Sequence, residues 1–475
     1  MTELLTAPSV ATAPRLRGSL LRPDSPGYDQ ARRIWNGMYD RRPAFIARCA
    51  DAGDVAAALR HARELGLPVT VRGGGHNVAG LCIADGAALI DLSPMREVRV
   101  DAAARIATAQ GGCLLGDVDA ATVPLGLACP AGVVSHTGLG GLALGGGYGW
   151  LARKWGLTCD HILGAEVVLA DGRIVHASAD EHPELLWALR GGGGNFGVVT
   201  RFTLRLRPVD RIYFHTAVYP LREAVGALAA YREYAETQSH DMHAVGAFKH
   251  AGQAVWIPRS LQGRPALFLS VAWFGEPHLG YEATAAKLST PAPAATASGV
   301  MPYAALQALG DHGEPHGHRY YTKSCYLTEL TDGPEQALID AAETSPSQRS
   351  SIDFEFLRGA ISEPADGDAP DHVGSAFPHR TAPYQCTASA QWTEPVEDAA
   401  NAAWARATVD ALGPWQQGGV YVNYLQHQLP GAAEELYGAE RYARLAAVKR
   451  DYDPYNTFRG HQNIRPAGQQ LATIR

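Results

Sequence analysis

Residues 69–77 read VTVRGGGHN, a short apolar strand candidate followed at once by Gly73, Gly74, Gly75 and His76. Because glycine has no Cβ, successive backbone N–H groups in such a stretch can turn toward an anion, and the resulting concavity suits a pyrophosphate. The stretch is not a Walker loop, since no GK[ST] follows, and it is not a GxGxxG that opens a helix. By itself it predicts either a phosphate-binding loop or a tight loop with a solvated His76.

The segments around this loop predict a glycine-rich α/β region that ends near residue 208. Residues 54–65 have apolar side chains at helical spacing behind an acidic cap candidate, whereas residues 1–45 read as a loose lead-in. Asp171-Gly172 between two apolar runs is the sharpest hairpin signal in the chain. The predicted strands here are 69–71, 88–92, 105–109, 165–169 and 174–176.

The middle of the chain has a different pattern, in which polar and apolar residues alternate along each predicted strand. Such strands suit an antiparallel sheet with one face on helices and one toward a cavity or water. The predicted strands are 213–219, 266–274, 351–357 and 385–392, and the predicted helices are 221–237, 334–344 and 396–412. Residues 289–298 read as a surface loop. The polar faces, which are candidate substrate contacts, carry Asp353, Glu355, Gln385, Thr387, Ser389 and Gln391.

Composition and charge exclude several classes of function. The 475 residues carry 41 Lys and Arg against 48 Asp and Glu, a net charge of −7, so the chain offers no electrostatic footprint for nucleic acid. No apolar run reaches the ~20 residues of a membrane-spanning helix, and residues 1–20 lack the pattern of a secretory signal. Seven scattered cysteines without CxxC spacing favour a reducing compartment, so we expect a cytoplasmic protein.

Three further motifs have chemical meaning only in combination. Residues 129–137 (CPAGVVSHT) continue into the glycine-rich run 138–150, which predicts backbone lying close to a large flat group. Cys129 in that context predicts an exposed thiol, although a lone cysteine is more often buried and inert. Residues 190–200 (RGGGGNFGVVT) and 453–459 (DPYNTFR) are each compatible with ordinary turns.

The four motifs in this order resemble the vanillyl-alcohol-oxidase-type FAD fold and, within it, the berberine-bridge-enzyme-like FAD-linked oxidases. The resemblance spans roughly residues 45–210 and 415–466. It implies FAD bonded twice, through His76 to the flavin 8α-methyl and through Cys129 to flavin C6. One departure is that His136 comes one position early, so its implied role in stabilising negative charge near flavin N1 competes with that of an ordinary loop histidine.

The resemblance also implies a set of cofactor contacts. In the first loop these are Arg72, Gly73, Gly74, Gly75 and Asn77, and in the second they are Gly132, Ser135, His136, Gly140, Gly146, Gly147, Tyr148 and Gly149. Gly197 and Val199 follow in the third motif, and Asn423 and Asn456 lie near the C-terminus.

The base that acts on substrate has two candidates. Residues 421–424 (YVNY) resemble a family strand whose second tyrosine deprotonates substrate, which implies Tyr424 with Tyr421 as its phenolic partner. A free tyrosine has a pKa near ~10, so Tyr424 needs a neighbouring cation or a hydrogen-bond network to act near neutral pH. Residues 358–363 (RGAISE) loosely resemble a segment that supplies a glutamate base, which implies Glu363 instead.

The loop 311–318 (DHGEPHGH) looks like a metal cluster because it carries His312, His316 and His318. Its proline and glycines exclude helical ligand spacing, and the resembled family needs no metal. We therefore predict no metal site and expect a solvated or substrate-side loop.

Together these observations predict an α+β, two-domain FAD-linked oxidase. Its FAD-binding domain is discontinuous, formed by residues 1–210 and completed by 416–475, and residues 211–415 form an antiparallel-sheet substrate domain. The expected reaction removes hydride from an alcohol of a sugar, a glycosyl group or a polycyclic natural product. Molecular oxygen, which Val133 and Val134 are small enough to admit, reoxidises the flavin and gives H₂O₂. The alternatives are oxidative ring closure and a non-catalytic flavin-bearing binding protein.

Overall fold

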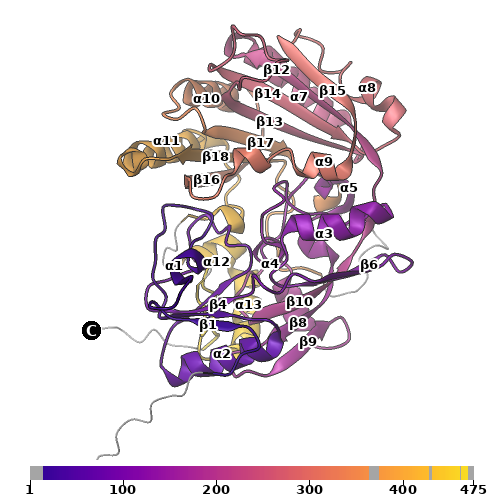
Figure 1. Ribbon diagram of the computed structural model, residues 1–475. Helices are drawn as coiled ribbons and strands as arrows, with labels where there is room; N and C mark the ends of the chain where they lie inside the picture. The colour runs from indigo at the N-terminus through magenta and orange to yellow at the C-terminus, as the bar shows by residue number, and fades with distance from the viewer. Residues whose placement is uncertain (1–13, 363–373, 427–430, 461, 469–475) are drawn as a thin grey trace, which may run out of the picture.

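The computed structural model describes residues 14–362, 374–426, 431–460 and 462–468. Its lower half in Figure 1 contains two small sheets and the C-terminal helices, and its upper half contains one large sheet with helices. This is the predicted α+β, two-domain architecture. The boundaries at residues 210 and 415 stay a prediction. Within the described part of the chain, no helix combines the length and apolarity needed to span a bilayer.

The first sheet holds the VTV strand, as predicted, and has the order β1-β2-β4-β3. β2, β4 and β3 are parallel, so Arg72 and Asp91 end neighbouring strands at the same edge. The helix predicted over 54–65 is α2 (Ala52–Glu64), whose N-cap is Asp51. The lead-in is more ordered than predicted, because it contains β1 and α1 (Tyr28–Ala31). The strands are β1 Ser19–Leu21, β2 Phe45–Arg48, β3 Val69–Arg72 and β4 Ala88–Asp91.

The second sheet is antiparallel, with the order β5-β6-β10-β8-β9. Its β8–β9 hairpin turns at Asp171-Gly172, where Gly172 has φ 88°, a left-handed conformation that favours glycine. The hairpin prediction is thus confirmed. The strands are β5 Val98–Asp101, β6 Ile106–Gln110, β8 Ile162–Val168, β9 Ile174–Ser178 and β10 Val198–Arg205; β7 (Leu127–Ala128) pairs separately with β11 (Arg207–Pro208).

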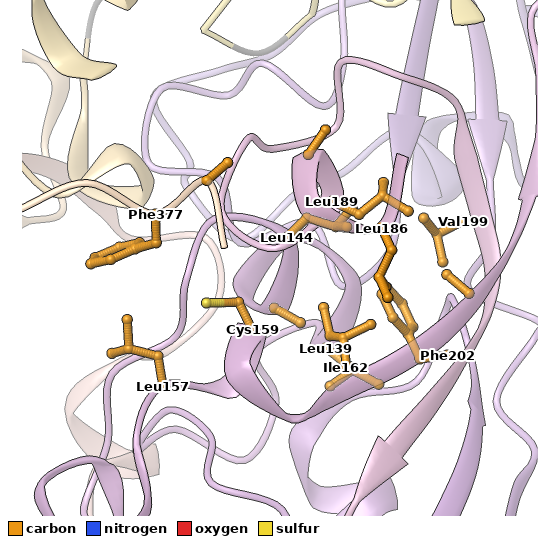
Figure 2. Packing of buried hydrophobic residues seen from close by; sticks show 14 of the residues in the cluster. Leu139, Leu144, Leu157, Cys159, Ile162, Leu186, Leu189, Val199, Phe202 and Phe377 are labelled. Atoms are coloured by element: carbon orange, nitrogen blue, oxygen red, sulfur yellow. The ribbon is translucent and has the colours of Figure 1, made fainter. Parts of the chain in front are cut away.

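Short helices join the glycine-rich loops to this sheet through one apolar core. α4 (Leu139–Leu144) follows Gly138 directly, and its Leu139 and Leu144 pack with Leu186 and Leu189 of α6 (Pro183–Leu189). Figure 2 shows these four side chains beside Val199 and Phe202 of β10. Burial of such side chains contributes about 1.5–3 kcal/mol each. Their packing therefore fixes α4 and, with it, the glycine-rich loop that precedes the helix.

The large sheet has seven antiparallel strands in the order β15-β12-β14-β13-β17-β18-β16. α7 (Ala224–Thr237), α10 (Asp332–Glu343) and α11 (Asp398–Ala411) pack on one face. The predicted antiparallel pairing with one helix-covered face is therefore confirmed. The strands are β12 Arg211–Pro220, β13 Met242–His250, β14 Pro265–Trp273, β15 Ala295–Pro302, β16 Arg319–Leu327, β17 Ser351–Phe356 and β18 Tyr384–Trp392.

Three of these strands were not predicted, and one of them overlaps the predicted loop 289–298. β15 begins at Ala295, and its first five residues are small or polar, so little in its sequence indicates a strand. It forms because it pairs along its length with β12 at the sheet edge, where backbone hydrogen bonds replace side-chain packing. β13 and β16 also lacked a sequence signal strong enough to be read.

The C-terminal segment packs into the lower half, beside elements from the N-terminal part of the sequence. Its helical stretch is broken at Gly438 (φ 74°) into α12 (Ala432–Tyr437) and α13 (Ala439–Tyr452), and α13 contacts α6. The fully buried Lys449 amine donates to Asp453, to the Asn195 carbonyl and to the Phe458 carbonyl at 2.7, 2.5 and 2.8 Å. One lysine therefore ties residues 453–458 to the third glycine motif.

Replacing Lys449 with methionine should lower the free energy of unfolding by about 3–5 kcal/mol, because the Asp453 carboxylate would stay buried without its counter-ion. Denaturant unfolding measures this change. Arg450→Met is the matched control: its ion pair with Asp451 is exposed, so we expect a change within about 1 kcal/mol. Equal effects of the two substitutions would contradict the structural role of Lys449.

Candidate active site

Arg72 fixes the start of the RGGGHN loop from the inside of the protein. Its guanidinium binds both oxygens of the fully buried Asp91, at 3.1 and 2.7 Å. It also donates to the Ala31 and Arg33 carbonyls at 2.5 and 3.1 Å. The side chain of Arg72 is thus fully engaged within the fold, and any contact of this residue with a cofactor has to come from its backbone.

The first two glycine motifs touch backbone to backbone. A Cβ on Gly74 would lie 2.4 Å from the Gly138 nitrogen, and a Cβ on Gly138 would lie 2.3 Å from the Gly74 nitrogen. A Cβ on Gly73 or on Gly140 would likewise lie 3.1 or 3.0 Å from the Gly111 carbonyl oxygen. Gly75 has φ 73°, a left-handed conformation. These glycines are required for the approach of the loops, which the sequence alone could not show.

His76 lies at the end of this contact, among other aromatic rings. It stacks on Trp35 with ring centroids 4.7 Å apart, and its Nε2 lies 2.7 Å from Nδ1 of His136. Burial, with smaller effects of His136 and His316, lowers the pKa of His76 well below its usual value. The imidazole is therefore neutral at pH 7, which leaves a nitrogen lone pair for attack on an electrophile.

The 311–318 loop is docked over the two histidines, with the His316 ring against both. Both oxygens of Asp311 accept hydrogen bonds from Ser135, from its N–H at 2.8 Å and its hydroxyl at 2.6 Å. His318 Nδ1 lies 3.0 Å from the Gln391 amide nitrogen, on the polar face of β18. The loop thus bridges the CPAGVVSH motif and the large sheet.

His316 brings a third imidazole close to His76 and His136. One ligand nitrogen from each of the three lies within 4.8 Å of the others, a spacing that a metal ion could use. Of the three loop histidines His312, His316 and His318, for which no metal was predicted, only His316 belongs to this group. His76 is also the predicted flavin anchor, so the two roles would need its two different ring nitrogens.

Cys129 is not the exposed thiol that the sequence predicted. Its side chain is 1% exposed, and burial, aided by the Asp119 carboxylate, raises its pKa to about 12. The sulfur points to its neighbour's carbonyl, 3.7 Å from Pro130 O, beside the Tyr303 hydroxyl. The physical reason is that residues 127–128 form β7 and draw the following residue into the core.

The third contact joins residues 145–149 to the C-terminal YVNY motif. The Tyr421 hydroxyl accepts hydrogen bonds from the Gly147 N–H and the Asn423 amide, both at 2.8 Å. Gly145 has no room for a Cβ, which would lie 2.1 Å from Asn423 Oδ1. Tyr148 packs edge-on against Tyr421, with centroids 4.5 Å apart, and shares a 2.9 Å hydrogen bond with Tyr326 of β16.

YVNY is not the strand that the resemblance implied. Residues 422–424 form a single 3-10 turn, which follows the left-handed Gly418 and Gly419. The Asn423 amide also donates to the Leu142 carbonyl at 3.2 Å, so side-chain bonds to α4 replace strand pairing. The turn places the rings of Tyr421 and Tyr424 at right angles, with centroids 4.9 Å apart.

Tyr424 is half-buried, and its phenol is influenced by groups from the sheet, the docked loop and the YVNY turn. No hydrogen bond to its hydroxyl is found among the described residues. Burial raises its pKa well above the usual value, and Glu355, Tyr421, Asp353 and Glu314 act in the same direction. The activating cation that a base at Tyr424 needs is not among these influences, which come from a second tyrosine and three carboxyl groups instead.

The polar face of the large sheet supplies those carboxylates, as the alternating sequence pattern predicted. In register across three strands lie Asp353, Thr387 and Ser324, and in the next row Glu355 and Gln385. The opposite-facing Phe354, Cys386 and Ala388 are buried against the helices. Ser324, 4% exposed, leaves its hydroxyl without a hydrogen-bond partner, and Glu355 lies 3.1 Å from His243.

Glu314 completes the acidic surroundings from the docked loop. Burial and the nearby Asp353 raise its pKa to about 8, so it is protonated at neutral pH and can donate a hydrogen bond. Burial likewise raises the pKa of Asp353. No sequence pattern indicates Glu314, Trp35, Tyr326 or Ser324, because their role depends on which strands and loops meet in space.

Most of the remaining predicted cofactor contacts have a structural role in the fold, and Asn456 is an exception. Asn77 caps its own turn by accepting from Ala79 and Leu81, and Gly197 is needed because a Cβ would lie 2.5 Å from Val167. Asn456, at φ 54°, has a buried amide oxygen without a partner. Gly132, Gly149 and Val199 lie in tightly packed backbone next to Leu142, Ala131 and Gly111. Glu363 lies outside the described residues.

Comparisons with known proteins agree with this geometry. The family model for the FAD-binding domain matches residues 43–178, and that for berberine and berberine-like proteins matches residues 420–465. An FAD-linked oxidoreductase of Dictyostelium discoideum is 31% identical over 458 residues, with 95% of each chain covered. The chain belongs to the berberine-bridge-enzyme-like FAD-linked oxidoreductases.

Other members of the family are similar over nearly the whole length of this oxidoreductase. The (R)-6-hydroxynicotine oxidase of Paenarthrobacter nicotinovorans is 31% identical, with 97% of this chain and 99% of that chain covered. The structure of a glucooligosaccharide oxidase from Acremonium strictum, with 6-S-cysteinyl, 8α-N1-histidyl FAD, has a TM-score of 0.79. It is 25% identical over 94% of this chain and 97% of that one.

FAD is the cofactor of this oxidoreductase, and the described residues fit it. The contact of Gly74 with Gly138 gives a backbone surface without side chains beside His76, and Asn456 offers a buried oxygen in need of a donor. A flat ring system beside the contact of Gly74 with Gly138 and a polar cofactor group beside Asn456 would account for both features.

Replacing Tyr421 with phenylalanine should lower the free energy of unfolding of the oxidoreductase by about 1–3 kcal/mol, because the buried Gly147 N–H loses its acceptor. Thermal or denaturant unfolding measures the loss. In the control Tyr442→Phe, the hydroxyl removed makes one long, exposed contact at 3.4 Å, so we expect a change within about 0.5 kcal/mol. A neutral Tyr421→Phe would mean that the phenol does not hold the glycine loop.

Proposed function

We propose that this protein is an oxidase that removes hydride from the carbon bearing a substrate hydroxyl, with a sugar, a glycosyl group or a polycyclic natural product as the alcohol. The observation that carries the proposal is the unpartnered Tyr424 hydroxyl beside the polar sheet face of Asp353, Glu355 and Gln385. Carboxylates and amides recognise hydroxyl-rich substrates by hydrogen bonds. The relative named glucooligosaccharide oxidase supports this substrate class.

The protein residues account for the proton in this reaction. As hydride leaves, the hydroxyl of the alcohol must lose a proton, since a neutral alcohol has little tendency to release hydride. Tyr424 can accept the substrate hydroxyl in a hydrogen bond. Because the pKa of Tyr424 is raised, a free phenolate is disfavoured, and the proton has to pass to a carboxylate nearby. Asp353 and Glu355, whose charges act on the Tyr424 phenol, are the proposed acceptors.

The bound cofactor supplies a two-electron acceptor whose reduced form returns its electrons to oxygen, so that alcohol and O₂ give a carbonyl compound and H₂O₂. The chain contributes access for oxygen at residues 133–134, where Val133 is partly exposed and Gly310 lies against its carbonyl. The relatives named oxidases support oxygen as the acceptor.

Covalent attachment at His76 and Cys129 is part of the proposal. His76 meets its chemical requirement, because it is neutral and its Nε2 is held by His136. Cys129 does not meet its requirement in the position described. The thiolate is the nucleophile, and a thiol with a pKa of about 12 is protonated at neutral pH. Attachment at Cys129 therefore requires the sulfur to leave the position beside Asp119.

The tethers can be counted by mass spectrometry and by the colour of acid-precipitated protein. With two bonds, His76→Ala and Cys129→Ala each keep the flavin in the pellet, and the double variant releases it. Loss of all flavin from His76→Ala alone would leave His76 as the single anchor and remove Cys129 from the proposal. Cys159→Ala, which removes another buried thiol near Gly146, is the control and should keep the wild-type flavin content.

Replacing Tyr424 with phenylalanine should slow anaerobic flavin reduction at least ~100-fold, the lower end of what a positioned acid–base group contributes. Sugars and polycyclic alcohols that bleach the wild-type flavin in stopped-flow measurements serve as substrates. Reoxidation in air should keep its rate, since the phenol acts on the substrate. Tyr455→Phe, at an 86% exposed position, is the control. A near-wild-type reduction rate would remove Tyr424 from the mechanism, and the absence of any bleaching alcohol would contradict the proposed function.

A further inference from the structure

A second cavity lies on the other side of the large sheet from the polar face. Its volume is about 620 Å³, and it is lined at one end by Phe356 and Tyr384. Both residues belong to the helix-covered face of the sheet, whereas Asp353 and Glu355 alternate with them on the opposite face. The cavity is therefore separate from the candidate active site.

Arg153 of α5 (Ala152–Trp155) lines this cavity with an uncompensated charge. The residue is 2% exposed, and its Nε and Nη1 have no hydrogen-bond partner. Its guanidinium lies over the Phe356 ring, 4.8 Å from the centroid, and no ion pair of Arg153 is found among the described residues. Burial lowers its pKa, yet arginine stays charged in proteins.

A buried, unpaired guanidinium is expensive, because charged donors lose their hydration without gaining acceptors. Arginine side chains are almost never fully buried unless they are paired with a carboxylate. The stacking on Phe356 offsets part of this cost. The unfilled donors Nε and Nη1, buried at the wall of a cavity this large, instead indicate a missing acceptor.

The cavity has a second free cation, Arg358. It is exposed, has no described partner and takes the unusual φ of 22°, followed by Gly359 at φ 69°. Gly359 packs on the Arg153 backbone, since a Cβ there would lie 2.6 Å from the Arg153 carbonyl. The two arginines thus come from adjoining segments on one wall of the cavity.

The other charges of the cavity are already engaged or lie at its rim. Arg232 is paired with Glu335, and the Tyr384 hydroxyl donates to Glu236 at 3.3 Å. Glu329 is exposed, and His240 is a neighbour of Gly359. Arg153 and Arg358 are left as donors without acceptors.

We propose that this cavity is a binding site for an oxyanion, a ligand that carries a phosphate or carboxylate group held by Arg153 and Arg358. Guanidinium groups match both anions with two parallel hydrogen bonds. Phe356 and Tyr384 add aromatic surface, which suits a ligand with an apolar or ring portion behind its anionic group.

The position of the site gives the ligand a structural effect. α5 directly follows the glycine run 145–150, and it packs against β13 of the large sheet. Figure 1 places α5 where the two halves meet. An anion on Arg153 would therefore tie the flavin half to the sheet that carries the substrate face.

Thermal unfolding of the flavin-loaded enzyme tests the site, with inorganic phosphate and citrate as probes and sodium chloride at equal ionic strength as reference. We expect a saturable rise in Tm of about 2 °C or more for at least one probe. A response to phosphate alone or citrate alone assigns the anion class. Arg153→Met should lose the response and, without ligand, should be at least as stable as the wild type, because an unpaired buried charge is removed.

Arg259→Met, which removes an exposed arginine outside the cavity, should keep the full response. Should Arg153→Met fail to fold, the exposed Arg358→Ala still tests the site and should weaken probe affinity at least fivefold. The proposal is overturned if the wild type responds to neither probe, if Arg153→Met responds like the wild type, or if Arg358→Ala leaves the affinity unchanged.

Discussion

The close approach of Gly74 and Gly138 is the constraint on which the rest of the structure depends. Each residue occupies the volume where the other would carry a Cβ, so the two loops can meet only as bare backbone. Arg72 with Asp91 holds one loop from behind, and the leucines of α4 hold the other. His76 and His136 meet 2.7 Å apart because both loops are fixed in this way.

The same contact explains how residues from distant parts of the chain reach one site. Asp311 binds Ser135 next to His136, and Tyr421 binds Gly147 a few residues further on. The large sheet and the C-terminal segment thus attach to the same glycine-rich run. Tyr424 faces the carboxylates of β17 as a result of these attachments rather than of its own local structure.

Much of the fold could be predicted because its signals are local. The hairpin at Asp171-Gly172, the helix over 54–65 and the alternating polar face of β18 follow from turn chemistry and periodicity. β15 could not be read, because its small residues are held by backbone pairing at a sheet edge. In the site, His76 and Tyr424 came from motifs. The turn at Val422–Tyr424 depends on bonds to Gly147 and Leu142, which are more than 270 residues away in the sequence. The burial of Cys129 depends on the pairing of β7 with β11, and the position of Glu314 on the docking of its loop, which no local pattern contains.

Successive residues of β17 and β18 point to opposite faces of the sheet, so substitutions on one face and on the other have different consequences. Phe354, Cys386 and Ala388 meet the helices, while their immediate neighbours Asp353, Glu355, Gln385 and Thr387 lie on the opposite face, which is the proposed substrate face. On the proposed function, a codon change at any of the latter would alter recognition without disturbing the packing beneath. Relatives with this scaffold can therefore diverge toward unrelated compounds one position at a time while the anchoring of the cofactor stays untouched.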